Sequence, residues 1–185
     1  MNTGSEANER SGELTHAIAE LESFAPEPEC GLPEEVFQLV SRLTPLLSVD
    51  LLIQDDAGRI LLTWRHDGAY GPGWHIPGGI IRYKERALDR LHAVARTELG
   101  AEVTCDVTCE ATCEPIPALV VEHVKPESSN RGHVVSLLYR CRLLTPPAEK
   151  LRFDAETPKP GHWQWHTRGA IRLIPEQQMY EPYLR

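Results

Sequence analysis

The segment from Trp74 to Gly100 limits the choice of fold more than any other part of the chain. It begins with Trp-His-Ile-Pro-Gly-Gly and continues into a helix predicted over 84–99, which Gly100 would end as a left-handed cap. At 100° per residue, this helix has an apolar arc formed by Ala87, Leu88, Leu91, Val94, Ala95 and Leu99. Such an arc needs a sheet or other helices to cover it, which predicts a domain of mixed helices and strands.

One carboxylate falls inside this apolar arc, since Glu98 projects between Ala87 and Leu91. A buried carboxylate is costly unless a cation or strong donors meet it. The alternative is that Glu98, in the last turn, reaches water. The preceding Gly78 and Gly79 allow a tight turn that presents a backbone carbonyl to a ligand. A carbonyl and a carboxylate together form an oxygen-rich site that suits Mg²⁺.

The remainder of the chain supplies strands for such a domain. Apolar runs at 46–53 and 59–64 predict a hairpin around the turn 54–58. Further strands are predicted at 101–108, 115–124, 133–144 and 161–166. Loops are expected at 67–79 and 146–160. Mixed strands around a central helix indicate an α/β or α+β fold.

Residues 1–30 differ from the rest because they carry seven acidic residues and one basic residue. The spacing of Leu14, Ile18 and Leu21 predicts one short helix within 14–24, which the prolines that follow would end. A second helix is predicted over 32–43. We therefore expect an acidic arm at 1–30 and one domain at 31–185.

Charge and composition exclude several classes of protein. The net charge of the 185 residues is −8, but residues 31–185 carry 20 acidic and 18 basic residues and are nearly neutral. The chain has no basic stripe of the kind that nucleic-acid binding requires. It also lacks the run of about 18 apolar residues that a membrane span needs. The polar, acidic N-terminus resembles no secretory signal, so we expect a cytoplasmic protein.

Three of the five cysteines, Cys105, Cys109 and Cys113, repeat at every fourth position. In a strand, neighbouring members of this series would lie about 13 Å apart, too far to share one metal ion. The β-branched residues between them disfavour a helix. We expect neither a metal site nor a disulfide framework from these cysteines.

The residues around the predicted helix resemble the Nudix hydrolase family, whose box reads Gly-x5-Glu-x7-Arg-Glu-apolar-x-Glu-Glu-x-Gly-apolar. The matching positions are Gly79, Glu85, Glu98, Gly100 and Ala101, and the departures are Ala93, Val94 and Thr97 in place of Arg, Glu and Glu. The segments TPLLSVDLLIQDDAGRILLTWR and GPGWHIPGG, with the box ending Thr-Glu-Leu-Gly, are similar to the GDP-mannose mannosyl hydrolase branch. That branch keeps the Arg that Ala93 replaces here.

The resemblance implies an α/β/α sandwich with a mixed sheet, here preceded by an N-terminal helical extension. It also implies Mg²⁺ or Mn²⁺ bridging protein and diphosphate, and suggests a homodimer. The expected metal ligands are the Gly78 carbonyl and Glu98, with Glu85 as a further candidate. Arg65 matches an arginine that contacts the diphosphate, a role that suits a planar fork of donors. Trp74 is an aromatic residue near the site that could stack on a base or sugar, although core packing is the commoner role of Trp.

In this branch the diphosphate is the leaving group, and water attacks the sugar carbon C1 with a histidine as base. The lost box carboxylates leave little to orient a water at phosphorus, so the sequence favours C–O cleavage of a nucleotide sugar. The candidates for catalysis are His162, His123 and Asp50, although His162 could cap an edge strand and Asp50 could satisfy a core hydrogen bond. Two alternatives stay open: cleavage of the P–O–P bond, and a nucleotide-binding module without turnover.

Overall fold

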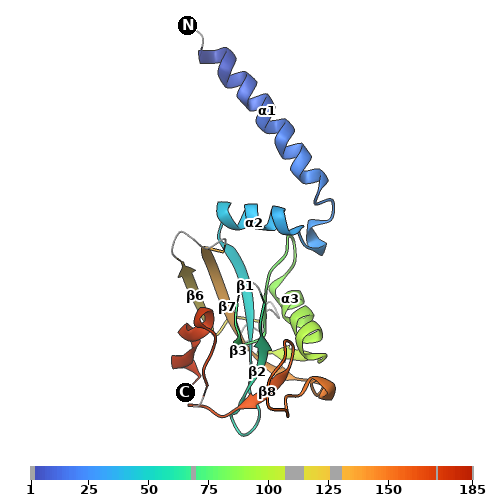
Figure 1. The fold of residues 1–185 in the computed structure, drawn as a ribbon, viewed down its shortest axis with the longest axis vertical. Coiled ribbons are helices and arrows are strands. Elements are labelled where there is room, and N and C mark those ends of the chain that lie inside the picture. The colour runs from blue at the N-terminus through green and yellow to red at the C-terminus, as the bar shows by residue number, and fades with distance from the viewer. Residues whose placement is uncertain (1–2, 68–69, 107–114, 126–130, 170, 185) are drawn as a thin grey trace.

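The computed structural model describes residues 3–67, 70–106, 115–125, 131–169 and 171–184. Two β-sheets form the body of the described chain, and a long helix extends away from it (Figure 1). The first sheet has the order β4-β1-β7-β5, with β6 also paired to β7. Its strands are β1 (Leu46–Ile53), β4 (Gly78–Ile80), β5 (Val103–Cys105), β6 (Leu119–Val124) and β7 (His133–Leu143). Because β1 and β7 run parallel and the other pairs are antiparallel, this sheet is mixed, as predicted.

The second sheet is antiparallel and has the order β3-β2-β8. Its strands are β2 (Ile60–Arg65), β3 (Gly73–His75) and β8 (Trp163–His166). The expected hairpin between 46–53 and 59–64 is therefore wrong, because β1 and β2 lie in different sheets. Only a single bridge joins Gln54 to Ile60. Both edges of β1 are already occupied, by β4 and by β7, so the chain diverges after the turn.

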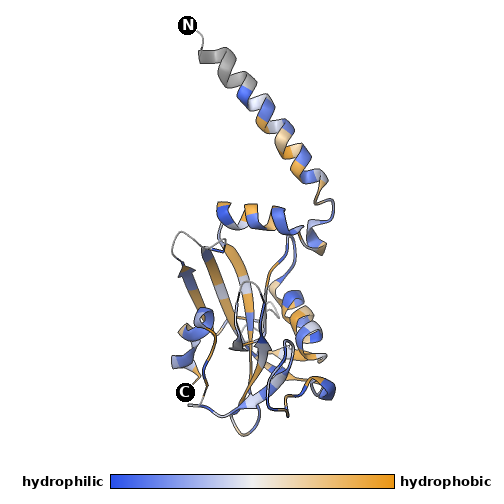
Figure 2. Ribbon diagram, viewed as in Figure 1, coloured by the Kyte–Doolittle hydropathy of each residue, from blue (hydrophilic) through white to orange (hydrophobic). Residues whose placement is uncertain are grey.

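Alternate residues of β1 face two hydrophobic clusters on opposite sides of the sheet. Leu51 packs in the cluster that contains helix α3 (Ala87–Val94), whereas Leu52 packs in the cluster that contains Tyr180. Tyr180 lies in η4 (Pro175–Tyr183), a 3₁₀ segment that was not predicted. These three layers confirm the predicted sandwich of helices around a mixed sheet, and Figure 2 shows β1 and β7 as predominantly hydrophobic.

The central helix differs from its prediction in where it begins and in the type of its last turn. It begins at Ala87 rather than at 84, and its last turn, η2 (Ala95–Leu99), is a π-helix. Gly100 ends this turn with φ 61° and ψ 31°, the left-handed conformation expected of a glycine cap. Since π-turns widen the helix locally, they change the direction in which the side chains of the last turn project.

The N-terminal part is more helical than predicted. Helix α1 spans Thr3–Ser23, and its described side chains, from Arg10 to Ser23, are exposed. Helix α2 (Glu34–Leu43) follows the short turn η1 (Pro28–Cys30) and lies at one end of the first sheet (Figure 1). No helix among the described residues has the length and hydropathy needed to cross a membrane.

The two predicted loops contain short regular elements, and one of the three repeated cysteines lies within the described residues. The expected loop 67–79 contains β3 and the start of β4, and the loop 146–160 contains the single turn η3 (Glu149–Leu151). Cys105 is buried on β5 directly opposite Cys141 of β7, with their sulfurs 2.9 Å apart. Cys109 and Cys113 lie outside the described residues, so the expectation about the three cysteines is not tested.

Candidate active site

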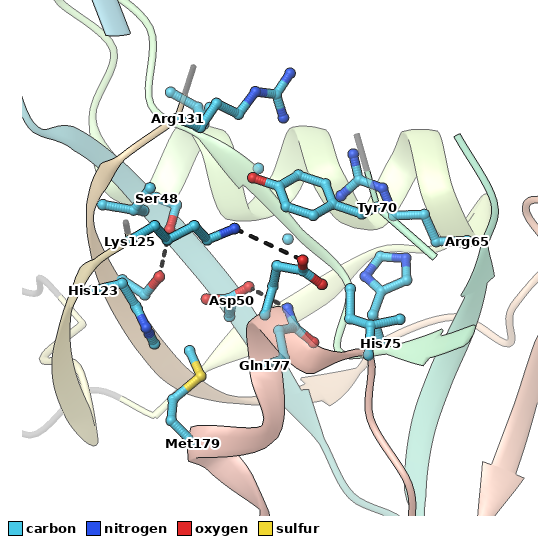
Figure 3. Close-up of a pocket in the computed structure, with 17 residues that line it drawn as sticks. Ser48, Asp50, Arg65, Tyr70, His75, His123, Lys125, Arg131, Gln177 and Met179 are labelled. Carbon is cyan, nitrogen blue, oxygen red and sulfur yellow. Dashed lines mark hydrogen bonds and ion pairs between the residues drawn. The ribbon is translucent and has the colours of Figure 1, made fainter. Parts of the chain in front are cut away.

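A cavity opens between the first sheet, the end of β2 and the C-terminal segment η4 (Figure 3). Strand β1 contributes Ser48 and Asp50, and β4 contributes the paired glycines of the predicted turn. Cations line it from the end of β2 and from both ends of the β6–β7 connection. The lining side chains that carry charge or a titratable ring are Asp50, Arg65, Tyr70, His75, His123, Lys125, Arg131 and Glu176.

Glu98 lies next to this cavity and points from the π-turn towards β2 and β4. Its Oε2 accepts a hydrogen bond from the Thr63 hydroxyl at 2.9 Å, and its Oε1 accepts one from the Gly78 amide at 3.3 Å. Burial raises the pKa of Glu98 to about 7, against the opposing effects of these hydrogen bonds and of the Arg65 charge. The side chain keeps 26% of its surface exposed, so the carboxylate can still meet a ligand. The expectation that Glu98 and Gly78 lie together agrees with this geometry.

His75, which the sequence reasoning missed, is hydrogen bonded at both ring nitrogens. Nδ1 lies 2.9 Å from the Ile76 carbonyl, so Nδ1 must be the donor in that bond. Nε2 lies 2.9 Å from the Thr63 hydroxyl, which also bonds to Glu98. Burial, and then the charge of Arg65, lower the pKa of His75 to about 4, so the ring is neutral at pH 7. Because the Thr63 hydroxyl has one proton, it can donate to Nε2 of this neutral ring or to Glu98, but not to both at once.

Asp50 is buried at the base of the cavity, and both of its carboxylate oxygens accept hydrogen bonds from η4. Gln177 donates to Oδ1 at 3.0 Å, and the Tyr180 hydroxyl donates to Oδ2 at 2.7 Å. Gln177 also pairs with both backbone groups of Ile76. Burial nevertheless raises the pKa of Asp50 to about 7. Asp50 therefore anchors the C-terminal segment, which is the second of its two predicted roles, while its position in the cavity keeps the first open.

Gly78 is required because β4 approaches β1 very closely at Asp50. A Cβ atom at Gly78 would lie 2.2 Å from Asp50 Oδ1 and 2.8 Å from the Val49 carbonyl oxygen. At Gly79 the nearest atom would be a Val94 methyl group at 3.0 Å. The first glycine is thus fixed by contact with Asp50, and the second by contact with helix α3.

Two of the other predicted residues also line the cavity. Arg65 lies at the end of β2 and forms an ion pair with Asp67. His123 lies on β6, and its Nε2 is buried without a hydrogen-bond partner among the described residues. Burial, and then the nearby charge of Lys125, lower the pKa of His123, so its ring is a neutral base at pH 7.

Neither His162 nor Trp74 is among the residues that line the cavity. His162 lies in the turn before β8, where its Nδ1 accepts a hydrogen bond from the Lys159 amide at 3.2 Å. Trp74 packs edge-on against Trp64 and His166, with ring centres 5.2 and 4.6 Å away. These contacts favour the structural roles that the sequence left open for both residues.

Glu85 is held by Arg90 rather than turned towards Glu98. Arg90 Nε donates to Glu85 at 2.8 Å, its Nη2 forms an ion pair with the same carboxylate at 2.8 Å, and the Arg82 amide also donates to Glu85. Arg90 thus supplies a basic side chain one helical turn before Ala93, the residue that replaces the arginine of the box. These contacts give Glu85 the task of fixing the loop before α3, and they do not support its expected role as a metal ligand.

The two lost box carboxylates have been replaced by residues that serve the helix itself. Val94 is buried in the hydrophobic cluster between α3 and the sheet. The Thr97 hydroxyl donates back to the Ala93 carbonyl at 2.8 Å. Among the described residues, no group of three or more His, Cys, Asp or Glu side chains could hold a metal ion without further ligands.

Known proteins share this architecture and part of this sequence. The model of the NUDIX domain family matches residues 44–184, which is most of the chain. The chain belongs to the NUDIX family. The NUDIX domain therefore contains every residue of the site described above, whereas α1 and α2 precede it.

The NUDIX relatives extend the comparison to one curated protein and two solved structures. The low-salt glycan biosynthesis protein Agl8 of Haloferax volcanii is 33% identical over 87 residues, covering 47% of this chain. The match spans 55% of that relative, or about half its length. A MutT NUDIX hydrolase from Burkholderia pseudomallei superposes with a TM-score of 0.54 at 22% identity, covering 76% of this chain and 96% of that one. A UDP-X diphosphatase gives 0.53 at 17% identity, covering 94% and 76%. These structures establish a shared NUDIX fold.

Proposed function

We propose that this chain is a divalent-cation-dependent hydrolase of a nucleoside diphosphate sugar, or a similar derivative, and that it cleaves the glycosyl C–O bond. The observation that carries the proposal is that Glu98 is the one carboxylate left among the last three glutamate positions of the box, since Val94 and Thr97 occupy the other two. A single helix carboxylate can help to hold a cation on a leaving diphosphate. Attack at phosphorus would in addition need a group to orient the water there.

The donor set of the site fits Mg²⁺ or Mn²⁺ if substrate and water complete the coordination. The Glu98 carboxylate and the Gly78 carbonyl would both bind through oxygen. Mg²⁺ takes few protein ligands and keeps water and phosphate oxygens. The charge of Arg65 lowers the pKa of Glu98 and that of Asp50 raises it, so both groups lie close enough to act on Glu98. When bound, the cation would stabilise negative charge on the departing diphosphate.

Arg65 would bind the diphosphate oxygens. It lines the cavity, and its charge acts on both His75 and Glu98. Its planar donors suit two phosphate oxygens at once. Since Asp67 already pairs with Arg65, the guanidinium is oriented before a ligand arrives.

His123 is the histidine that we assign as general base. It lines the cavity, its Nε2 has no partner among the described residues, and its lowered pKa keeps it neutral. His75 also lines the cavity, but both of its nitrogens are hydrogen bonded. His123 would take the proton of the water that attacks the sugar carbon.

Agl8 is named for glycan biosynthesis, and that name supports a sugar-linked substrate for this chain as well. The test is a product analysis with Mg²⁺ and a panel of nucleotide sugars and dinucleotides. Free sugar with nucleoside diphosphate is expected. Nucleoside monophosphate would indicate cleavage between the phosphates instead, and ligand-induced thermal stabilisation without products would indicate a binding module.

A further inference from the structure

Three cations from separate parts of the chain surround one aromatic ring at the cavity. The Cζ atom of Arg65 lies 4.6 Å from the centre of the Tyr70 ring, Lys125 Nζ lies 4.7 Å from it, and Arg131 Cζ lies 5.4 Å from it. All four residues line the cavity, and Figure 3 shows the cations grouped around the ring. The distances are those of cation–π contacts.

The backbone of Tyr70 is fixed by hydrogen bonds with Asp67, and this limits where its ring can lie. The Tyr70 amide donates to Asp67 Oδ1 at 2.8 Å, and the Asp67 amide donates to the Tyr70 carbonyl at 3.0 Å. The same aspartate pairs with Arg65. The loop after β2 therefore presents the ring and the first cation as one unit.

The other two cations reach the same ring from the two ends of the β6–β7 connection. Lys125 follows β6 and lies 3.8 Å from Glu176 of η4. Arg131 precedes β7 and lies over a second ring, that of Phe37 in α2, at 5.0 Å. Each cation is thus held towards the cavity by a contact other than Tyr70 as well.

The three like charges around the ring repel one another, and Asp67 and Glu176 compensate two of them in part. An anion between the three cations would add to this compensation. Lys125 and Arg131 are thus two cations beyond Arg65, the residue already proposed to bind a diphosphate. The ring also joins two loops that are far apart in the sequence, so its loss would release cations on both sides of the cavity.

We propose that Tyr70 is a positioning residue that assembles Arg65, Lys125 and Arg131 into one anion subsite for phosphate groups linked in tandem. The choice of phosphate as the ligand rests on the proposed function, whereas the assembly of the cations by the ring does not. The face of the ring carries this role, and the hydroxyl group is not needed for it.

Binding of inorganic tripolyphosphate to the full chain in EDTA tests the proposal without metal or turnover, with isothermal titration calorimetry as the readout. Tyr70→Leu should weaken binding by about tenfold, because the contacts of three cations are lost. Tyr70→Phe should stay within about twofold of wild type, since it keeps the ring face. Tyr83→Leu is the matched control, because Tyr83 is an exposed ring with Lys84 over it at 5.0 Å and lies outside the cavity lining.

In turnover assays with the same variants, Tyr70→Leu should raise KM more than it lowers kcat, and Tyr70→Phe should restore KM. Wild-type binding by Tyr70→Leu, or equal damage from Tyr70→Phe, would overturn the proposal. If Tyr70→Leu does not fold by circular dichroism, Lys125→Gln and Arg131→Gln take its place, and each should weaken binding at least threefold. Unchanged binding in both would also overturn it. Tripolyphosphate binding with no hydrolysis of any nucleotide would leave the subsite standing and refute the proposed function.

Discussion

At the scale of single residues, the site depends on groups whose protonation is set by burial. Burial raises the pKa of both Asp50 and Glu98 to about 7 and lowers that of His75 to about 4. Both carboxyls therefore take up protons easily near neutral pH, while the histidines that line the cavity are neutral. Perturbed pKa values of this kind cluster at functional sites.

Replacing His123 separates the two histidines that the sequence proposes as base. His123→Gln should lower kcat by about 10²–10⁴-fold, the usual contribution of a general base. His162→Gln is the matched variant, and it should retain wild-type kcat because His162 does not line the cavity. The opposite ranking of the two variants in steady-state assays would return the role to His162.

The buried Asp50 makes the stability of the protein depend on pH. Because its folded pKa is raised to about 7 from 3.8, its ionisation costs stability as pH rises from about 4 to about 7. Over that interval, wild type should lose on the order of a few kcal/mol relative to Asp50→Asn, which cannot ionise. Urea unfolding in EDTA at several pH values measures this difference. A constant difference between the two proteins would show that Asp50 titrates normally.

At the scale of secondary-structure elements, the site lies where three short elements meet. Strand β4 packs closely against β1, the π-turn η2 directs Glu98 towards β2 and β4, and η4 supplies the partners of Asp50. The close approach of β4 to β1 depends on a residue without a side chain at Gly78.

Alanine substitution of the two glycines should therefore have unequal effects. Gly78→Ala places a methyl group against Asp50 and backbone, and should cost about 3 kcal/mol. Gly79→Ala meets only side-chain atoms of Val94 and Arg90, and should cost about 1 kcal/mol. Thermal unfolding of the two variants provides the comparison, and equal losses would contradict the packing described here.

At the scale of the whole molecule, residues 1–30 differ from the rest of the chain in net charge and in the exposure of their described side chains. The acidic excess belongs to residues 1–30, and the described side chains of α1 are exposed. Exposed apolar residues such as Leu14 and Ile18, 61% and 46% exposed, make no contribution to the core of the domain.

Removal of residues 1–25 should therefore leave the domain intact. We expect the melting temperature to change by no more than about 2 °C, because little buried surface is lost. Turnover should also be unchanged. A large fall in either quantity for the shortened chain would show that α1 contributes to the domain.

The apolar arc of α3 and the apolar run of β1 are strong local patterns, and they predicted a domain of mixed helices and strands. The sandwich with a mixed sheet was implied by the resemblance to the Nudix family. The prediction failed for the pairing of β1 with β2, since edge occupancy is decided by distant strands. The proximity of Glu98 and Gly78 followed from the Gly-Gly turn and the helix. The contacts of Gln177 and Tyr180 with Asp50 could not be predicted, because they join residues more than 120 positions apart. No role was predicted for His75, although it lies two residues before the Pro-Gly-Gly turn.

The central claim is that water attacks the sugar carbon rather than phosphorus. Hydrolysis of a nucleoside diphosphate sugar in ¹⁸O-water with Mg²⁺, followed by mass spectrometry of both products, tests it directly. We expect the label in the sugar and an unlabelled nucleoside diphosphate. Label in the phosphate product would refute attack at the sugar carbon and assign this chain to cleavage at phosphorus.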